Sequence, residues 1–192
     1  MTDFGLILIG AALADNLVLA RMLGVEPWLD APPRLAPVAA RALVAALTLT
    51  LAAAAGWLVE HALLHPLQAE FLRPFALILL AVGLSQVVAR ALCRWTPALA
   101  AGADLRPALL GVDSTVLAAA LLAATRPDGF VGATALGLGA GLGFGLVLLM
   151  FAAMRGRLAA AAVPAPFRGA PIGLITAALM ALAFLGFAGM GR

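Results

Sequence analysis

Hydrophobic residues form six long runs in this chain, and shorter stretches containing arginine and proline separate them. The runs cover residues 4–23, 40–58, 71–89, 109–124, 130–154 and 171–190. A helix that crosses a bilayer needs roughly 20 mostly apolar residues, and backbone inside lipid must satisfy its own hydrogen bonds. The pattern therefore predicts an all-α integral membrane protein with six transmembrane helices.

The composition leads to the same class of protein. Of the 192 residues, 65% are hydrophobic and 11% are charged, whereas soluble domains are roughly 45–50% apolar and about 25% charged. We therefore expect a single membrane domain over residues 1–192. All twelve basic residues are arginines, and they do not cluster into a stripe, so no nucleic-acid partner is indicated.

The distribution of arginine predicts how the chain is oriented in the membrane. If the N-terminus lies outside, nine arginines fall in cytoplasmic connections and three lie outside: Arg73, Arg126 and Arg192. Cytoplasmic loops carry an excess of basic residues, so we expect both termini on the periplasmic side of a bacterial inner membrane. A signal peptide begins with a positive segment, but Asp3 precedes the first arginine, so we expect the first run to be retained.

A short pattern occurs twice, in the first and the fourth run. Residues 15–20 read DNLVLA and residues 113–118 read DSTVLA, with identity at four of six positions. Two halves of three helices each, about 1–95 and 96–192, would be inverted repeats. Interrupted spans at matching positions of such halves indicate a site near the bilayer midplane. The alternative is chance similarity in a chain rich in alanine and leucine.

Asp15, Asn16 and Asp113 are the polar residues of these two interruptions. A carboxylate deep in a membrane costs at least ~2.5–3.5 kcal/mol, and such groups usually face the protein interior or a water-filled cavity. They are candidates for an ion or proton path. The alternative is a structural role, with a neutral aspartate or one bonded to backbone amides. These residues alone leave open a transporter, a channel or a subunit of a larger complex.

Glycines in the fifth run recur at four-residue spacing. One row contains Gly137, Gly141 and Gly145, and the other contains Gly139 and Gly143. Small residues at this spacing allow helix backbones to approach closely. We expect close packing, either within the chain or against another subunit.

Several segments resemble a known family of membrane subunits. These are MTDFGLILIGAALADNLVLARMLG, PLQAEFLRPFALILLAVGLSQVV, and VPAPFRG followed by LITAALMALAFLGF. They resemble RnfA-type subunits of the wider family of Rnf and Nqr membrane subunits, over nearly the whole chain. The resemblance implies six helices in two inverted halves. It also implies a complex that couples electron transfer between NADH and ferredoxin to sodium or proton movement, in which this chain is not catalytic alone.

The resemblance further implies partners and a cofactor. RnfA-type subunits pair with a homologous RnfE-type subunit of opposite orientation and assemble with RnfB, RnfC, RnfD and RnfG. The paired subunits share a [2Fe–2S] cluster, to which each contributes two cysteines.

This chain departs from that family at both cysteine positions. Glu26 in LGVEP and Ser114 in DST occupy them, and the single cysteine, Cys93, matches neither. Carboxylate and hydroxyl oxygens are poor replacements for thiolates. Three explanations remain open: a cluster with oxygen ligands, no cluster, or a diverged paralogue that only scaffolds the complex. A stand-alone ion transporter is the remaining alternative for the function as a whole.

Overall fold

The computed structural model describes residues 2–14, 16–17, 19–21, 23, 35–97, 114–126, 128–159 and 161–187. These residues form helices, turns and short irregular segments, and the described part of the chain contains no strand. The α-helices are α1 (Thr2–Ile9), α3 (Leu35–Val59), α4 (Arg73–Trp95), α6 (Ser114–Ala124), α7 (Gly129–Ala159) and α8 (Ala170–Leu185). Short π- and 3-10 segments are η1 (Gly10–Ala14), η2 (Glu60–Leu64), η3 (Glu70–Leu72) and η5 (Ala165–Phe167). The all-α prediction is confirmed.

Three helical segments are long and apolar enough to cross a membrane: Pro37–Leu64, Glu70–Trp95 and Gly129–Leu158. Three further apolar helices are shorter as described: Phe4–Ala14, Ser114–Ala124 and Ala170–Leu185. The chain is therefore a multi-pass helical membrane protein. The first two of the shorter helices adjoin residues outside the described part of the chain, so six complete crossings stay a prediction.

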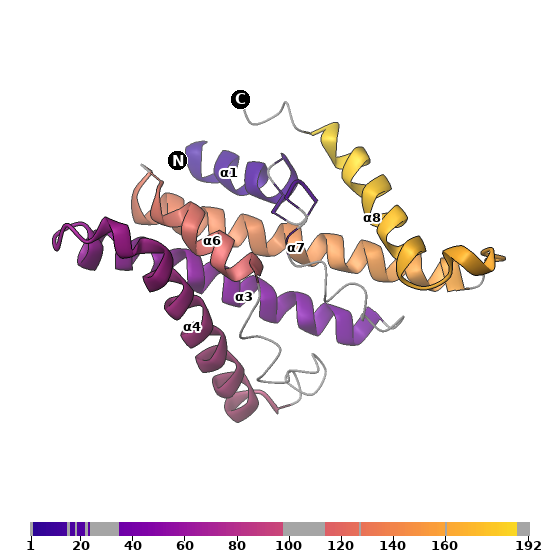
Figure 1. The fold of residues 1–192 in the computed structure, drawn as a ribbon, viewed down its shortest axis with the longest axis horizontal. Coiled ribbons are helices and arrows are strands. Elements are labelled where there is room, and N and C mark those ends of the chain that lie inside the picture. The colour runs from indigo at the N-terminus through magenta and orange to yellow at the C-terminus, as the bar shows by residue number, and fades with distance from the viewer. Residues whose placement is uncertain are drawn as a thin grey trace.

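Helix α7 lies at the centre of the molecule, with α3 packed along it (Figure 1). A Cβ added at Gly141 would lie 2.6 Å from Ala46 Cα, and one at Gly145 would lie 3.2 Å from Ala42 Cβ. Numbers that fall on one helix as they rise on the other mean that the two helices are antiparallel. Glycine at these positions permits the close backbone approach.

The other row of glycines packs against the first span. A Cβ at Gly139 would lie 2.5 Å from the backbone oxygen of Leu8, and one at Gly143 would lie 2.6 Å from that of Ala12. Here both numbers rise together, so α1 and η1 run parallel to α7. The predicted close packing is confirmed, and both glycine rows face partners within this chain.

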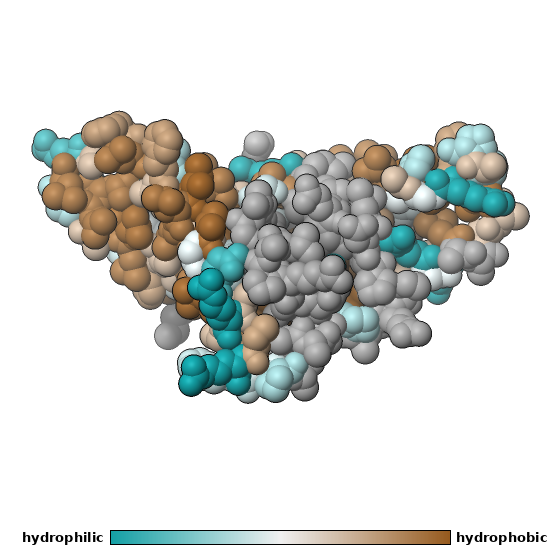
Figure 2. All heavy atoms as spheres, turned by 60° about the horizontal axis from the view of Figure 1, so that its bottom comes forward, coloured by the Kyte–Doolittle hydropathy of each residue, from teal (hydrophilic) through white to brown (hydrophobic). Residues whose placement is uncertain are grey.

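The outer helices α4 and α8 leave this central pair in opposite directions (Figure 1). Their outward faces carry large exposed apolar side chains, which suit contact with lipid or with another membrane subunit. On η3 and α4 these are Phe71, Leu72, Phe75, Ile78, Leu79, Val82 and Val87, and on α8 they are Leu174, Ile175, Leu179, Leu182 and Leu185. Figure 2 shows hydrophobic surface gathered at one end of the molecule and hydrophilic residues at the other end.

Candidate functional site

Asn16 lies where the first helical segment is interrupted, shortly after the end of η1. It is 2% exposed, which places an amide side chain in the protein interior. Its Nδ2 donates a hydrogen bond to the backbone oxygen of Ala12 at 2.8 Å, and its Oδ1 accepts one from the backbone nitrogen of Leu19 at 3.4 Å. The side chain therefore bonds to backbone on both sides of the break, where the regular helical pattern does not.

The π-segment η1 accounts for the change in the helix just before this residue. A π-helix contains a wider turn than an α-helix, and such turns occur often at functional sites. Gly143 of α7 lies against the break, since a Cβ there would be 2.8 Å from Asn16 Nδ2. A side chain at position 143 would thus collide with the polar group. The glycine row and the asparagine together form one packed unit.

The remaining predicted site residues are less fully placed. Ser114 is the first residue of α6, and it is exposed. Asp15, Glu26 and Asp113 lie outside the described residues. Of the five residues predicted from sequence, the structure therefore places Asn16 in the interior and Ser114 on the surface.

The residues of this chain do not fit a [2Fe–2S] cluster. The two positions that the family resemblance assigns to ligands hold Glu26 and Ser114, which offer hard oxygen donors in place of soft thiolates. Cys93 is exposed in the last turn of α4. Within the described part of the chain, no group of three or more His, Cys, Asp or Glu side chains is close enough to hold a metal ion.

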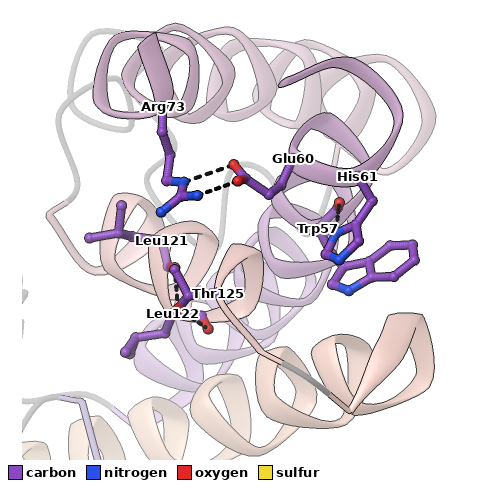
Figure 3. Close-up of polar contacts among 7 residues, drawn as sticks. All are labelled: Trp57, Glu60, His61, Arg73, Leu121, Leu122 and Thr125. Atoms are coloured by element: carbon purple, nitrogen blue, oxygen red, sulfur yellow. Dashed lines mark hydrogen bonds and ion pairs between the residues drawn. The ribbon is translucent and has the colours of Figure 1, made fainter. Parts of the chain in front are cut away.

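An ion pair that sequence reasoning missed joins the second and third long segments (Figure 3). Arg73 Nε donates to Glu60 Oε2 at 2.9 Å, and Arg73 Nη2 donates to Glu60 Oε1. The Glu60 side chain is 7% exposed and that of Arg73 is 28% exposed. In the sequence, Arg73 only interrupts the start of an apolar run. The available signal was one acid and one base, on opposite sides of a tight connection between two long helices.

Aromatic packing surrounds the same end of the α3 segment. The rings of Trp57 and His61 stack with centroids 4.1 Å apart, and Phe130 of α7 meets Trp57 edge-on at 5.7 Å. The Nδ1 atom of His61 lies 3.1 Å from the backbone oxygen of Trp57. His61 therefore belongs to an aromatic cluster that helps to fix the ends of α3 and α7 together.

The fold and the site define a helical multi-pass membrane protein with a buried amide at a break in its first span. Residues 4–191 match the family described as "Rnf-Nqr subunit, membrane protein". The chain belongs to this family of membrane subunits.

Curated relatives of this chain share one name, which describes the A-type subunit of an "ion-translocating oxidoreductase complex". The protein of that name from Pseudomonas paraeruginosa strain DSM 24068 / PA7 is 42% identical over the full length of both chains. Those from Pseudoalteromonas atlantica and Aliivibrio fischeri are 41% and 40% identical, each alignment covering 99% of this chain and 98% of the relative.

Proposed function

We propose that this chain is the A-type membrane subunit of an Rnf-type complex that couples electron transfer between NADH and ferredoxin to ion movement. The observation that carries the proposal is the match to A-type relatives over their full length. The all-helical, apolar fold supports it, because the chain's role would lie within the membrane. On this proposal the chain works in a bacterial inner membrane with an RnfE-type subunit and with RnfB, RnfC, RnfD and RnfG.

Co-purification with these partners tests the assignment. The tagged chain, expressed from its own locus and extracted in mild detergent, should bring down the other subunits of the complex. Its deletion should abolish ion movement driven by electron transfer in membrane vesicles. A chain that is recovered alone, and that moves sodium or protons by itself in liposomes, would instead be a stand-alone transporter.

The two halves, about 1–95 and 96–192, form inverted repeats on this proposal. The central pair supports this, because α3 and α7 occupy equivalent positions in the two halves and run antiparallel. The opposite departure of α4 and α8 supports it as well (Figure 1). The doubled D-x-x-V-L-A pattern would then mark one polar element in each half.

Asp15, Asn16 and Asp113 form that polar element and contribute to the ion path. Support comes from Asn16, because a buried amide that bonds to the backbone stabilises a break in a membrane helix. Replacing Asp113→Asn should slow ion movement by the intact complex, since it removes a charge from the path. Asp128→Asn is the matched control, because Asp128 is an exposed residue paired with Arg126 at a connection. Equal transport by the wild type and the Asp113 variant would contradict this role.

This copy of the subunit supplies no thiolate ligands, and we propose that it acts without a cysteine-ligated cluster of its own. Glu26 and Ser114 at the ligand positions support this. Iron content and reduced-state EPR of the intact complex should show no [2Fe–2S] signal that changes in Glu26→Ala or Ser114→Ala variants. A signal that does change would establish a cluster with oxygen ligands.

A further inference from the structure

A cavity of about 840 Å³ lies where α7 ends and α8 begins. The last turns of α7, the connection that follows and the first turn of α8 enclose it, at the right-hand end of the molecule in Figure 1. Its lining residues are Phe151, Arg155, Leu158, Ala161, Val163, Arg168, Gly169, Ala170, Ile172 and Gly173. None of them belongs to the site around Asn16.

Two arginines from different elements give the cavity its charge. Arg155 comes from α7 and Arg168 from the connection to α8. Arg168 Nε donates to the backbone oxygen of Val163 at 2.8 Å, which fixes the direction of its guanidinium group. A guanidinium group has five N–H donors, so this bond leaves others for an anion. No acid occurs in the sequence after Asp128, and so no carboxylate from this region competes for them.

The rest of the lining is apolar. Phe151 is 1% exposed, and Leu158, Val163 and Ile172 add aliphatic surface. A cavity with cationic groups and apolar walls fits an amphiphile that has an anionic head and hydrocarbon chains. A small hydrophilic anion would leave the apolar walls unused.

The length of α7 places this cavity near the membrane boundary. Its 31 residues span about 46 Å at a rise of about 1.5 Å per residue. The hydrocarbon core is only about 30 Å thick, so the last turns of α7 reach the headgroup layer. Figure 2 shows hydrophilic residues at this same end of the molecule. Basic pockets between membrane helices at this depth are suited to anionic lipid headgroups.

We propose that the cavity between α7 and α8 binds an anionic phospholipid, with the phosphodiester held by Arg155 and Arg168. The acyl chains would run along the apolar walls toward the exposed face of α8. Phosphate oxygens accept charge-assisted hydrogen bonds from arginine, and these are stronger than bonds between neutral groups. Such a lipid would fasten α8 to α7 at an elbow where the two helices otherwise diverge (Figure 1).

Native mass spectrometry of the full chain in neutral detergent tests this. The chain is titrated with phosphatidylglycerol and, separately, with phosphatidylcholine that has the same acyl chains. We expect phosphatidylglycerol to be retained in preference. Arg155→Gln and Arg168→Gln should each weaken that binding roughly tenfold, the effect of losing one hydrogen bond to a charged group.

Arg157→Gln is the matched control, because Arg157 is an exposed residue of the same helix that does not line the cavity. It should leave binding unchanged. Equal retention of both lipids, or equal loss in all three variants, would overturn the proposal. Displacement of phosphatidylglycerol by the same concentration of inorganic phosphate would also overturn it, since it would indicate a site for free phosphate. Circular dichroism establishes that each variant is folded, and the two cavity variants test the site independently.

Discussion

At the scale of single residues, Asn16 and Gly143 depend on each other. An unsatisfied polar group in an apolar interior costs several kcal/mol, and Asn16 avoids this cost by bonding to backbone at Ala12 and Leu19. The bonds form within its own segment, so no partner from α7 is needed. What α7 must supply is space, and Gly143 supplies it. A polar break in a membrane span thus requires a small residue opposite as well as the polar residue itself.

Gly143→Ala should therefore destabilise the protein. The new Cβ would lie 2.6 Å from the backbone oxygen of Ala12, and backbone cannot move aside as a flexible side chain can. We expect a loss of about 1–3 kcal/mol, typical of overpacking, measured as the free energy of unfolding in detergent. Gly156→Ala on the same helix is the control, because nothing lies within 4 Å of its added Cβ. Equal effects of the two substitutions would mean that the close approach is not limiting.

At the scale of elements, the connection between α3 and α4 is held by one ion pair. Glu60 lies in the π-segment η2 and Arg73 at the start of α4, and the two side chains form two parallel hydrogen bonds. Bidentate geometry of this kind is stronger and more directional than a single contact. The pair therefore fixes the angle at which α4 leaves α3 (Figure 3).

Removing one member of this pair should cost more than removing both. Glu60→Leu leaves the arginine without its partner, and we expect a loss of about 1–3 kcal/mol, below the value for a fully buried pair because Arg73 is 28% exposed. The double variant Glu60→Leu, Arg73→Leu should recover part of the loss. A double-mutant cycle in detergent measures the coupling. The exposed pair of Arg126 and Asp128 serves as the reference, and a coupling no larger than that reference would contradict the role assigned to Glu60.

Apolar length predicted these helices well, and their ends poorly. The run 71–89 predicted the third helix, which continues to Trp95 through Arg90, Cys93 and Arg94. Hydropathy cannot detect this extension, because a helix continues in the interfacial layer where arginine reaches water. The run 40–58 likewise ends before Glu60, whose charge is compensated only by a residue from the next helix.

The candidate site was partly predictable for a similar reason. A polar residue inside an apolar run indicates a break, and that pattern identified Asn16. The partner of each glycine row could not be predicted, because spacing shows that two backbones approach without showing which ones. The π-segments η1 and η2 leave no periodic signal in so few residues. The ion pair and the lipid cavity depend on contacts between elements, which a pattern along one chain does not contain.

At the scale of the whole molecule, arginines separate to the two ends of the helices. Arg41 lies early in α3, Arg94 late in α4 and Arg155 late in α7, and the antiparallel packing of α3 on α7 brings the first and the last to one end. At the other end Arg73 and Arg126 each pair with an acid. This asymmetry supports an orientation with the arginine-rich end in the cytoplasm and both termini outside.

The single cysteine makes this orientation measurable without further engineering. Cys93 is exposed in the last turn of α4, next to Arg94 at the arginine-rich end. A membrane-impermeant maleimide should therefore label inside-out vesicles and leave intact spheroplasts unlabelled. Thr2→Cys in a Cys93→Ser background should show the opposite pattern, because residue 2 starts the first span. Labelling of Cys93 in intact spheroplasts would reverse the orientation, and would place the proposed lipid cavity in the outer leaflet.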